Sequence, residues 1–128
     1  MLLPRLCLAV ALTPLGVAVP DKPLSPAEAR KKVGESATVE MTVRAAKDRL
    51  EKRGEIYLDS EEDFRDERNF AVVITKAGAA KLKEAGIADP AEHFRGKKIR
   101  ATGTVKEVDK VPRIEVDDAK QVRVAESG

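Results

Sequence analysis

The residues of this chain that could do chemistry are few. His93 is the only histidine and Cys7 the only cysteine, so the sequence cannot supply the usual zinc ligand set or a cysteine–histidine pair. The serines lack a nucleophile-elbow context, and no glycine-rich phosphate loop occurs. His93 precedes Phe94 in a short predicted turn, where a packing role is expected. We therefore predict no catalytic residue, no metal and no cofactor, in a protein that is not an enzyme.

Carboxylates are concentrated in residues 59–67, which raises the question of a calcium site. The acids with the alternate spacing that opens a calcium loop are Asp59, Glu61 and Asp63. Phe64 stands where such a loop needs glycine, and Phe70 stands where it needs its last acidic ligand. Arg65 and Arg68 supply counter-ions within the same segment. This pattern favours a loop closed by salt bridges, and whether the loop binds a cation stays open.

The residues best suited to hold a ligand are one tyrosine and several cations on the exposed side of predicted strands. If Ile56 and Leu58 point inward, Tyr57 points outward and can stack on a base or a sugar ring. Cations that point outward from the same or neighbouring strands can contact the phosphates of a nucleic acid. The predicted ligand-binding residues are Arg44, Tyr57, Lys98, Arg100, Lys106 and Arg113. An ordinary solvated surface is the alternative, because the chain has three phenylalanines, one tyrosine and no tryptophan.

Helix signals occur at three places. Ser25, Pro26 and Glu28 form a capping box, which predicts a helix that starts at Pro26 and ends at Gly34. Residues 77–85 are rich in alanine and predict a second helix, which Gly86 ends. A second N-cap, proline and glutamate signature in residues 89–92 predicts a further turn that stops at Gly96.

Strands are indicated by alternation of apolar and polar residues. Residues 37–45 alternate strictly, and the charged residues 47–53 are expected to interrupt that strand. The other predicted strands are residues 55–59, 69–75, 98–106 and 113–117, with a last short strand at Val122 and Val124. Residues 109–112 are predicted to form a turn. Phe70 and Phe94 are expected in the core.

This order of elements predicts the fold class. We expect a mainly β protein: a five-stranded Greek-key barrel of the OB (oligonucleotide/oligosaccharide-binding) fold, with a helix between strands 3 and 4 and a short N-terminal helix. A β-sandwich needs about seven strands and does not predict a helix at that position. Alternate residues of 37–45 and 99–105 are expected to line the inside of the barrel.

Two segments carry a family resemblance. Residues 96–105 read Gly-Lys-Lys-Ile-Arg-Ala-Thr-Gly-Thr-Val, and they are followed by Ile114-Glu115-Val116 and Gln121-Val122. With these segments, residues 25–125 resemble secreted bacterial OB-fold domains related to nucleic-acid-binding OB modules. The resemblance implies an OB barrel and single-stranded nucleic acid as the default ligand. A fold alone does not assign a site.

The first residues predict export. Arg5, a short apolar run and the small residues Gly16 and Ala18 are typical of a signal peptide, and the run is too short and too rich in proline for a membrane span. The predicted organisation is a signal peptide (1–18), a linker (19–24), an OB-fold domain (25–125) and a tail (126–128). Cleavage would remove Cys7 and leave a cysteine-free periplasmic or secreted protein without stable membrane insertion.

Function is predicted only as a class. With 24 Lys and Arg against 22 Asp and Glu, net charge gives no general attraction to nucleic acid. We expect a non-catalytic exported module that binds an extended polar ligand, by default single-stranded nucleic acid and alternatively an oligosaccharide, across a face carrying Tyr57 and Arg100. The alternatives are an envelope protein-interaction or stress module with a protein partner and, less favoured, an OB-type nuclease using Asp59, Arg65 and Arg100.

Overall fold

A computed structural model describes residues 22–125 of the chain. The predicted signal peptide (1–18) and tail (126–128) lie outside the described residues, as do residues 19–21 of the predicted linker. The helices are α1 (Pro26–Ala29), α2 (Leu50–Arg53), α3 (Lys76–Glu84), α4 (Pro90–Phe94) and the 3₁₀ turn η2 (Ala119–Gln121). The strands are β1 (Ser36–Thr42), β2 (Ala45–Arg49), β3 (Glu55–Asp59), β4 (Ala71–Thr75), β5 (Lys98–Val108), β6 (Val111–Val116) and β7 (Val122–Val124).

The described strands form one seven-stranded sheet with the order β1-β5-β6-β4-β3-β2, and β7 pairs with β5. The β4–β6 pair is parallel and the other pairs are antiparallel. The predicted mainly β class is confirmed, and α3 and α4 lie between β4 and β5 where a helix was predicted. The arrangement is consistent with an OB-like fold, although the number of strands differs from the predicted five.

The first predicted strand is divided because its chain changes partners. The amide of Val43 donates to the carbonyl of Lys97 beside β5, whereas the amide of Arg44 donates to the carbonyl of Asp59 in β3. β1 therefore pairs with β5 and β2 pairs with β3. The prediction that charged residues interrupt the strand from residue 47 was wrong, because residues 47–49 belong to β2. β2 lies at the end of the sheet path, where charged side chains are tolerated.

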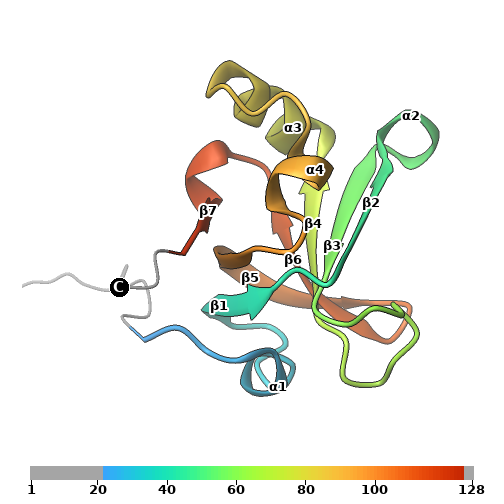
Figure 1. Ribbon diagram of the computed structural model, residues 1–128. Coiled ribbons are helices and arrows are strands. Elements are labelled where there is room, and N and C mark those ends of the chain that lie inside the picture. The colour runs from blue at the N-terminus through green and yellow to red at the C-terminus, as the bar shows by residue number, and fades with distance from the viewer. Residues whose placement is uncertain (1–21, 126–128) are drawn as a thin grey trace, which may run out of the picture.

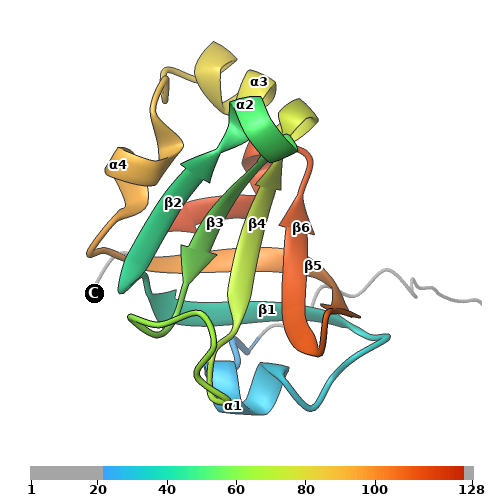
Figure 2. The same cartoon turned by 90° about the vertical axis from the view of Figure 1, so that its right-hand side faces the viewer.

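Figure 2 shows the layers: β2, β3, β4 and β6 stand side by side, and β1 and β5 cross behind them. The core lies between these layers. The predicted inward alternation is confirmed at Ala37, Val39, Ile99 and Val105, which are buried, but it was wrong at Ala45: after the change of partners at Val43 the phase shifts by one residue, and Ala46 is buried instead. Phe70 and Phe94 are also buried, as predicted. The opposite side of β2, β3, β4 and β6 faces outward and is crossed by no described helix in Figure 2.

The capping signals are confirmed, but some elements are shorter than predicted. The Ser25–Glu28 capping box starts α1 at Pro26, yet α1 ends at Ala29 and turns carry the chain to Gly34, whose φ is +92°. The amide of Gly34 then donates to the carbonyl of Val105 and joins this segment to β5. The turn predicted at residues 109–112 is shorter in the structure, because β6 already begins at Val111. Only Asp109 and Lys110 form the turn, and both have positive φ, as a two-residue hairpin turn requires.

Candidate functional site

The outward side of β2, β3, β4 and β6, here called the outer face, carries a row of side chains in register. Lys47 lies opposite Tyr57, Tyr57 opposite Val73, and Val73 beside Glu115. Ile56 is fully buried on the other side of β3, which confirms that Tyr57 points outward. Four neighbouring strands thus place a cation, an aromatic ring, an aliphatic side chain and a carboxylate side by side.

A hydrogen-bonded network holds the β6 side of the outer face. The Tyr57 hydroxyl donates to Glu55 Oε1 at 2.6 Å. Arg113 donates from Nη1 to Glu55 Oε2 at 3.1 Å and to Glu115 Oε2 at 3.4 Å, and Lys106 Nζ lies 3.2 Å from Glu115 Oε1. Partial burial, together with the bond to Glu55, raises the pKa of Tyr57, so its ring remains a neutral phenol at neutral pH. The network fixes the Tyr57 ring and balances the charge of Arg113.

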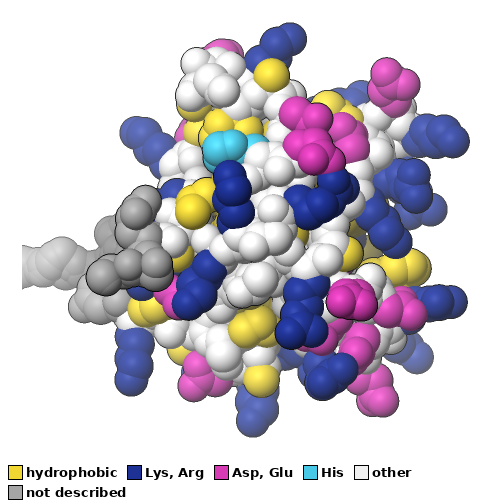
Figure 3. Space-filling view, viewed as in Figure 1, with side chains coloured by type: hydrophobic (Ala, Val, Ile, Leu, Met, Phe, Trp, Pro, Cys, Tyr) yellow, Lys and Arg dark blue, Asp and Glu magenta, His cyan; other side chains and the backbone are white. Residues whose placement is uncertain are grey.

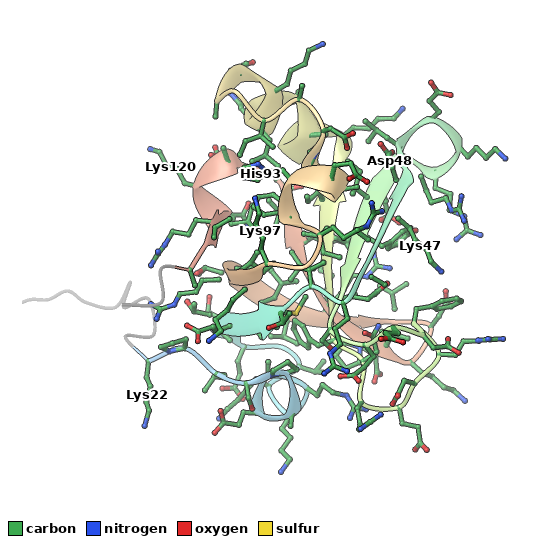
Figure 4. All side chains as sticks on the ribbon, viewed as in Figure 1. Lys22, Lys47, Asp48, His93, Lys97 and Lys120 are labelled. Atoms are coloured by element: carbon green, nitrogen blue, oxygen red, sulfur yellow. The ribbon has the colours of Figure 1, made fainter. Side chains whose placement is uncertain are left out.

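The β2 side of the outer face is basic. Register places Lys47 and Arg49 on the same side as Tyr57 and Glu55, and Lys52 and Arg53 follow on α2. None of these four cations forms a salt bridge with another residue in the range 22–125. Figure 3 shows Lys and Arg side chains gathered along the right-hand edge around α2, and Figure 4 shows Lys47 projecting from β2 on that side.

The loop of residues 60–70 borders the outer face and contains two Asp-x-Arg clamps, each a set of hydrogen bonds between residues two apart. Asp63 Oδ1 accepts from the amide and Nε of Arg65 at 2.9 and 3.0 Å, and Oδ2 accepts from Nη2 at 3.1 Å. Asp66 and Arg68 repeat this geometry at 2.9, 3.1 and 2.8 Å. The bonds from Arg68 lower the pKa of Asp66 to about 2. The predicted salt-bridged loop is therefore confirmed.

Buried polar groups anchor the base of the same loop. Ser60 Oγ accepts from the amide of Phe70 at 2.9 Å, and Asn69 Oδ1 accepts from the amide of Glu61 at 3.1 Å. Asn69 Nδ2 donates to Asp59 Oδ1 at 3.0 Å. Burial raises the pKa of Asp59, whereas the Asn69 hydrogen bond and the charge of Lys47 act in the opposite direction. The loop thus has a fixed base as well as two internal clamps.

Phe64 lies on this loop between the two residues of the first clamp and is 49% exposed. Lys47 Nζ lies 4.7 Å from the centre of the Phe64 ring, and the Arg65 guanidinium carbon lies 5.9 Å from it. Neither Phe64 nor Lys47 was predicted from the sequence as a site residue. A signal was available, because Phe64 is an aromatic residue within an Asp-x-Arg triplet in a polar loop.

The structure divides the six predicted binding residues. Tyr57, Lys106 and Arg113 lie together on the outer face, as described above. Arg100 lies in the part of β5 that pairs with β1, where its Nε bonds Glu40 Oε1 at 2.7 Å, and Lys98 lies 3.9 Å from the same carboxylate. Arg44 is exposed at the β1–β2 junction and lines a shallow hollow of about 460 Å³ with Lys98, Glu40, Glu61 and Arg68. Their role in binding stays a prediction.

Other features of the described residues add no chemistry. His93 packs edge-on against Phe94, with ring centres 4.8 Å apart, which confirms its packing role. Between residues 22 and 125, no group of three or more His, Cys, Asp or Glu side chains could hold a metal ion. No helix in that range is long and apolar enough to cross a membrane.

Comparisons with known proteins inform the fold. No protein-family model and no curated protein matches the chain. Asparaginyl-tRNA synthetase from Pyrococcus horikoshii matches 84% of the chain with a TM-score of 0.54 and 13% identity. A putative aspartyl-tRNA synthetase from Leishmania major Friedlin matches 89% with a TM-score of 0.53 and 10% identity. The OBody AM1L10, solved bound to hen egg-white lysozyme, matches 86% with a TM-score of 0.55 and 15% identity.

The extent of these matches differs. The chain spans 24% and 22% of the two synthetases, and 99% of the OBody. At such identities the likeness concerns the fold. The fold is OB-like.

Proposed function

We propose that this chain is a non-catalytic module that binds single-stranded nucleic acid on the outer face. The observation that carries the proposal is the placement of Tyr57 in the row from Lys47 to Glu115, on an open sheet surface beside the unpaired cations of β2. A fixed aromatic ring offers a stacking surface to any base, and nearby cations attract the phosphates. Two of the structures that share this fold are named as tRNA synthetases, which is consistent with such a ligand.

We also propose a more specific assignment of the fold, a five-stranded OB barrel with one added strand. β1 and β2 are separated only by Val43 and Arg44, so we infer that they act as one bent strand. That strand pairs with β5 at one end and with β3 at the other, which is how an OB barrel closes. β7 is then an addition to the five strands of the barrel. The signal-like residues 1–18 support export, which sequencing the N-terminus of the cell-derived protein would test.

The two sides of the outer face contribute differently to binding. Near β6, Arg113 and Lys106 are balanced by Glu55 and Glu115, so this side adds little attraction for phosphates. Near β2, Lys47 has no carboxylate partner among the described residues. We therefore place the phosphate chain along β2 and the stacked base on Tyr57.

The test is fluorescence anisotropy with labelled single-stranded DNA and RNA at two salt concentrations. Tyr57→Ala should weaken binding by about 1–3 kcal/mol, the usual contribution of one stacked base. Lys47→Gln should weaken binding and reduce the slope of log K against log salt by about 0.7, as expected for one lost contact to a single strand. Arg100→Gln removes the same charge at a site paired with Glu40, and should leave both quantities nearly unchanged.

Three results would argue against this assignment. Absence of oligonucleotide binding by the parent protein would refute the proposed function. Equal effects of Arg100→Gln and Lys47→Gln would favour the broader face predicted from the sequence. Tighter, salt-insensitive binding to an oligosaccharide would redirect the ligand class, because uncharged sugars release no counterions.

A further inference from the structure

The loop of residues 60–70 has more internal hydrogen bonds than a simple connection between β3 and β4 requires. Each clamp joins an aspartate to the backbone and the guanidinium of an arginine two residues later. The loop base is held by the buried side chains of Ser60 and Asn69. A loop that is already ordered loses little conformational entropy when it contacts a ligand, so this construction favours binding by its exposed residues.

Phe64 is the residue that this loop presents. It is one of two large hydrophobic side chains exposed in the described residues; the other is Val33, at 47% exposure in the turn after α1. Phe64 contributes little to the core, because about half of it faces solvent. Its ring is flanked by two cations, Lys47 and Arg65. Exposed aromatic rings next to cations are the residues with which proteins stack and hold single-stranded nucleic acid.

Lys47 connects Phe64 to Tyr57. Its amino group lies 4.7 Å from the centre of the Phe64 ring, and its backbone lies directly opposite Tyr57 in the β2–β3 register. Side chains directly opposite one another on the same face of an antiparallel pair are in contact range. The three side chains therefore follow one another as aromatic ring, cation and aromatic ring, which matches the repeat of base, phosphate and base in a nucleic acid strand.

We propose that Phe64 is a second stacking platform that acts together with Tyr57, and that Lys47 contacts the phosphate between the two stacked nucleotides. This inference rests on the proposed function and adds the direction of the ligand, which follows the β2 side of the outer face past Tyr57 and Lys47 towards the loop of residues 60–70. On binding, the Lys47 amino group moves from the Phe64 ring to the phosphate, and the base takes its place on the ring.

The experiment uses the same labelled oligonucleotide with Phe64→Ala, Phe64→Leu and Phe64→Trp. Alanine and leucine should raise Kd at least fivefold, as expected for the loss of one stacked base, whereas tryptophan should retain or improve affinity. Val33→Ala is the matched control, because it removes the other exposed apolar side chain, and it should leave Kd unchanged. Thermal melting should be similar for all four variants, because both side chains are about half exposed.

An oligonucleotide with abasic positions separates stacking from other effects. On an abasic strand, Phe64→Ala should have no further effect, because no base remains to stack. If Tyr57→Ala weakens binding while Phe64→Ala binds as the parent does, the second platform is refuted and the proposed function stands. If leucine fully replaces phenylalanine, the contact is apolar and the stacking role is refuted. If the parent binds no oligonucleotide, the proposed function fails, and this inference fails with it.

Discussion

Replacement of Arg113 by methionine tests whether this residue is a structural element of the outer face. Its guanidinium lies between Glu55 and Glu115, and its side chain is only 12% exposed. Methionine preserves much of the aliphatic packing but leaves two carboxylates on one face without their shared cation. We expect loss of stability and of the fixed position of Tyr57, which shares Glu55 with Arg113.

The expected size of this loss follows from the geometry. A hydrogen bond to a charged group contributes about 1.5–3 kcal/mol when it is shielded from solvent. The two bonds of Arg113 are 3.1 and 3.4 Å long, and both glutamates are 27% exposed, so solvent screens part of their contribution. We expect a total loss of about 2 kcal/mol. For a domain of roughly 100 residues, this corresponds to a decrease in Tm of about 10 °C.

Thermal melting followed by circular dichroism measures this effect, and Lys106→Met is the matched control. Lys106 carries the same charge and contacts the same Glu115, but its side chain is 51% exposed. An exposed ion pair contributes about 0–1 kcal/mol, so the control should melt within a few degrees of the parent. Adding Glu55→Gln to Arg113→Met should restore part of the loss by removing one unpaired carboxylate. Equal melting of the parent and Arg113→Met would refute the structural role.

Three further predictions concern stability. Gly78→Ala should destabilise by about 1–2 kcal/mol in urea unfolding, because overlap of the new Cβ with the Val116 carbonyl oxygen outweighs the roughly 1 kcal/mol gain in helix propensity. Asp59 has a raised folded pKa, so its contribution to stability falls as pH rises from about 3.9 through that pKa. The Tm of the parent should include this decrease between pH 3.5 and pH 7, and Asp59→Asn should remove it. Asp66 has a pKa of about 2, so its contribution is lost as pH falls from about 3.9 to about 2. Asp66→Asn should therefore melt below the parent at pH 5 and converge with it in acid.

The fold was predictable where the sequence pattern is local. The bounds of β3 follow from the alternation of Ile56, Tyr57 and Leu58, and the start of α1 follows from its capping box. The same alternation indicates the outward direction of Tyr57. These features depend on residues close in the chain, so composition and spacing are sufficient to identify them.

The remaining site depends on contacts between distant segments. Lys47 lies in a run of charged residues that resembles a loop, and it joins a strand only because the chain changes partners after Val43. The pairing of Arg113 with Glu55 joins β6 to β3, which are distant in sequence and lie on either side of β4. Phe64 approaches Lys47 only after β2 and β3 have paired and the loop has closed. Each of these contacts depends on which residues of neighbouring strands lie opposite one another. The alternation of apolar and polar residues in the sequence does not determine that pairing.

The same register explains how a protein of nearly balanced charge can present a directional surface. The formal net charge is only +2, yet the outer face separates its charges into two sides. On the β6 side, Glu55 and Glu115 neutralise the neighbouring cations and would repel phosphates that came close. On the β2 side, Lys47 and Arg49 have no such carboxylate partners among the described residues and would attract phosphates. Tyr57 lies at the boundary, with its hydroxyl bonded to Glu55 and its backbone paired with Lys47. In the proposed binding mode, this charge placement would direct the strand along β2 towards Phe64.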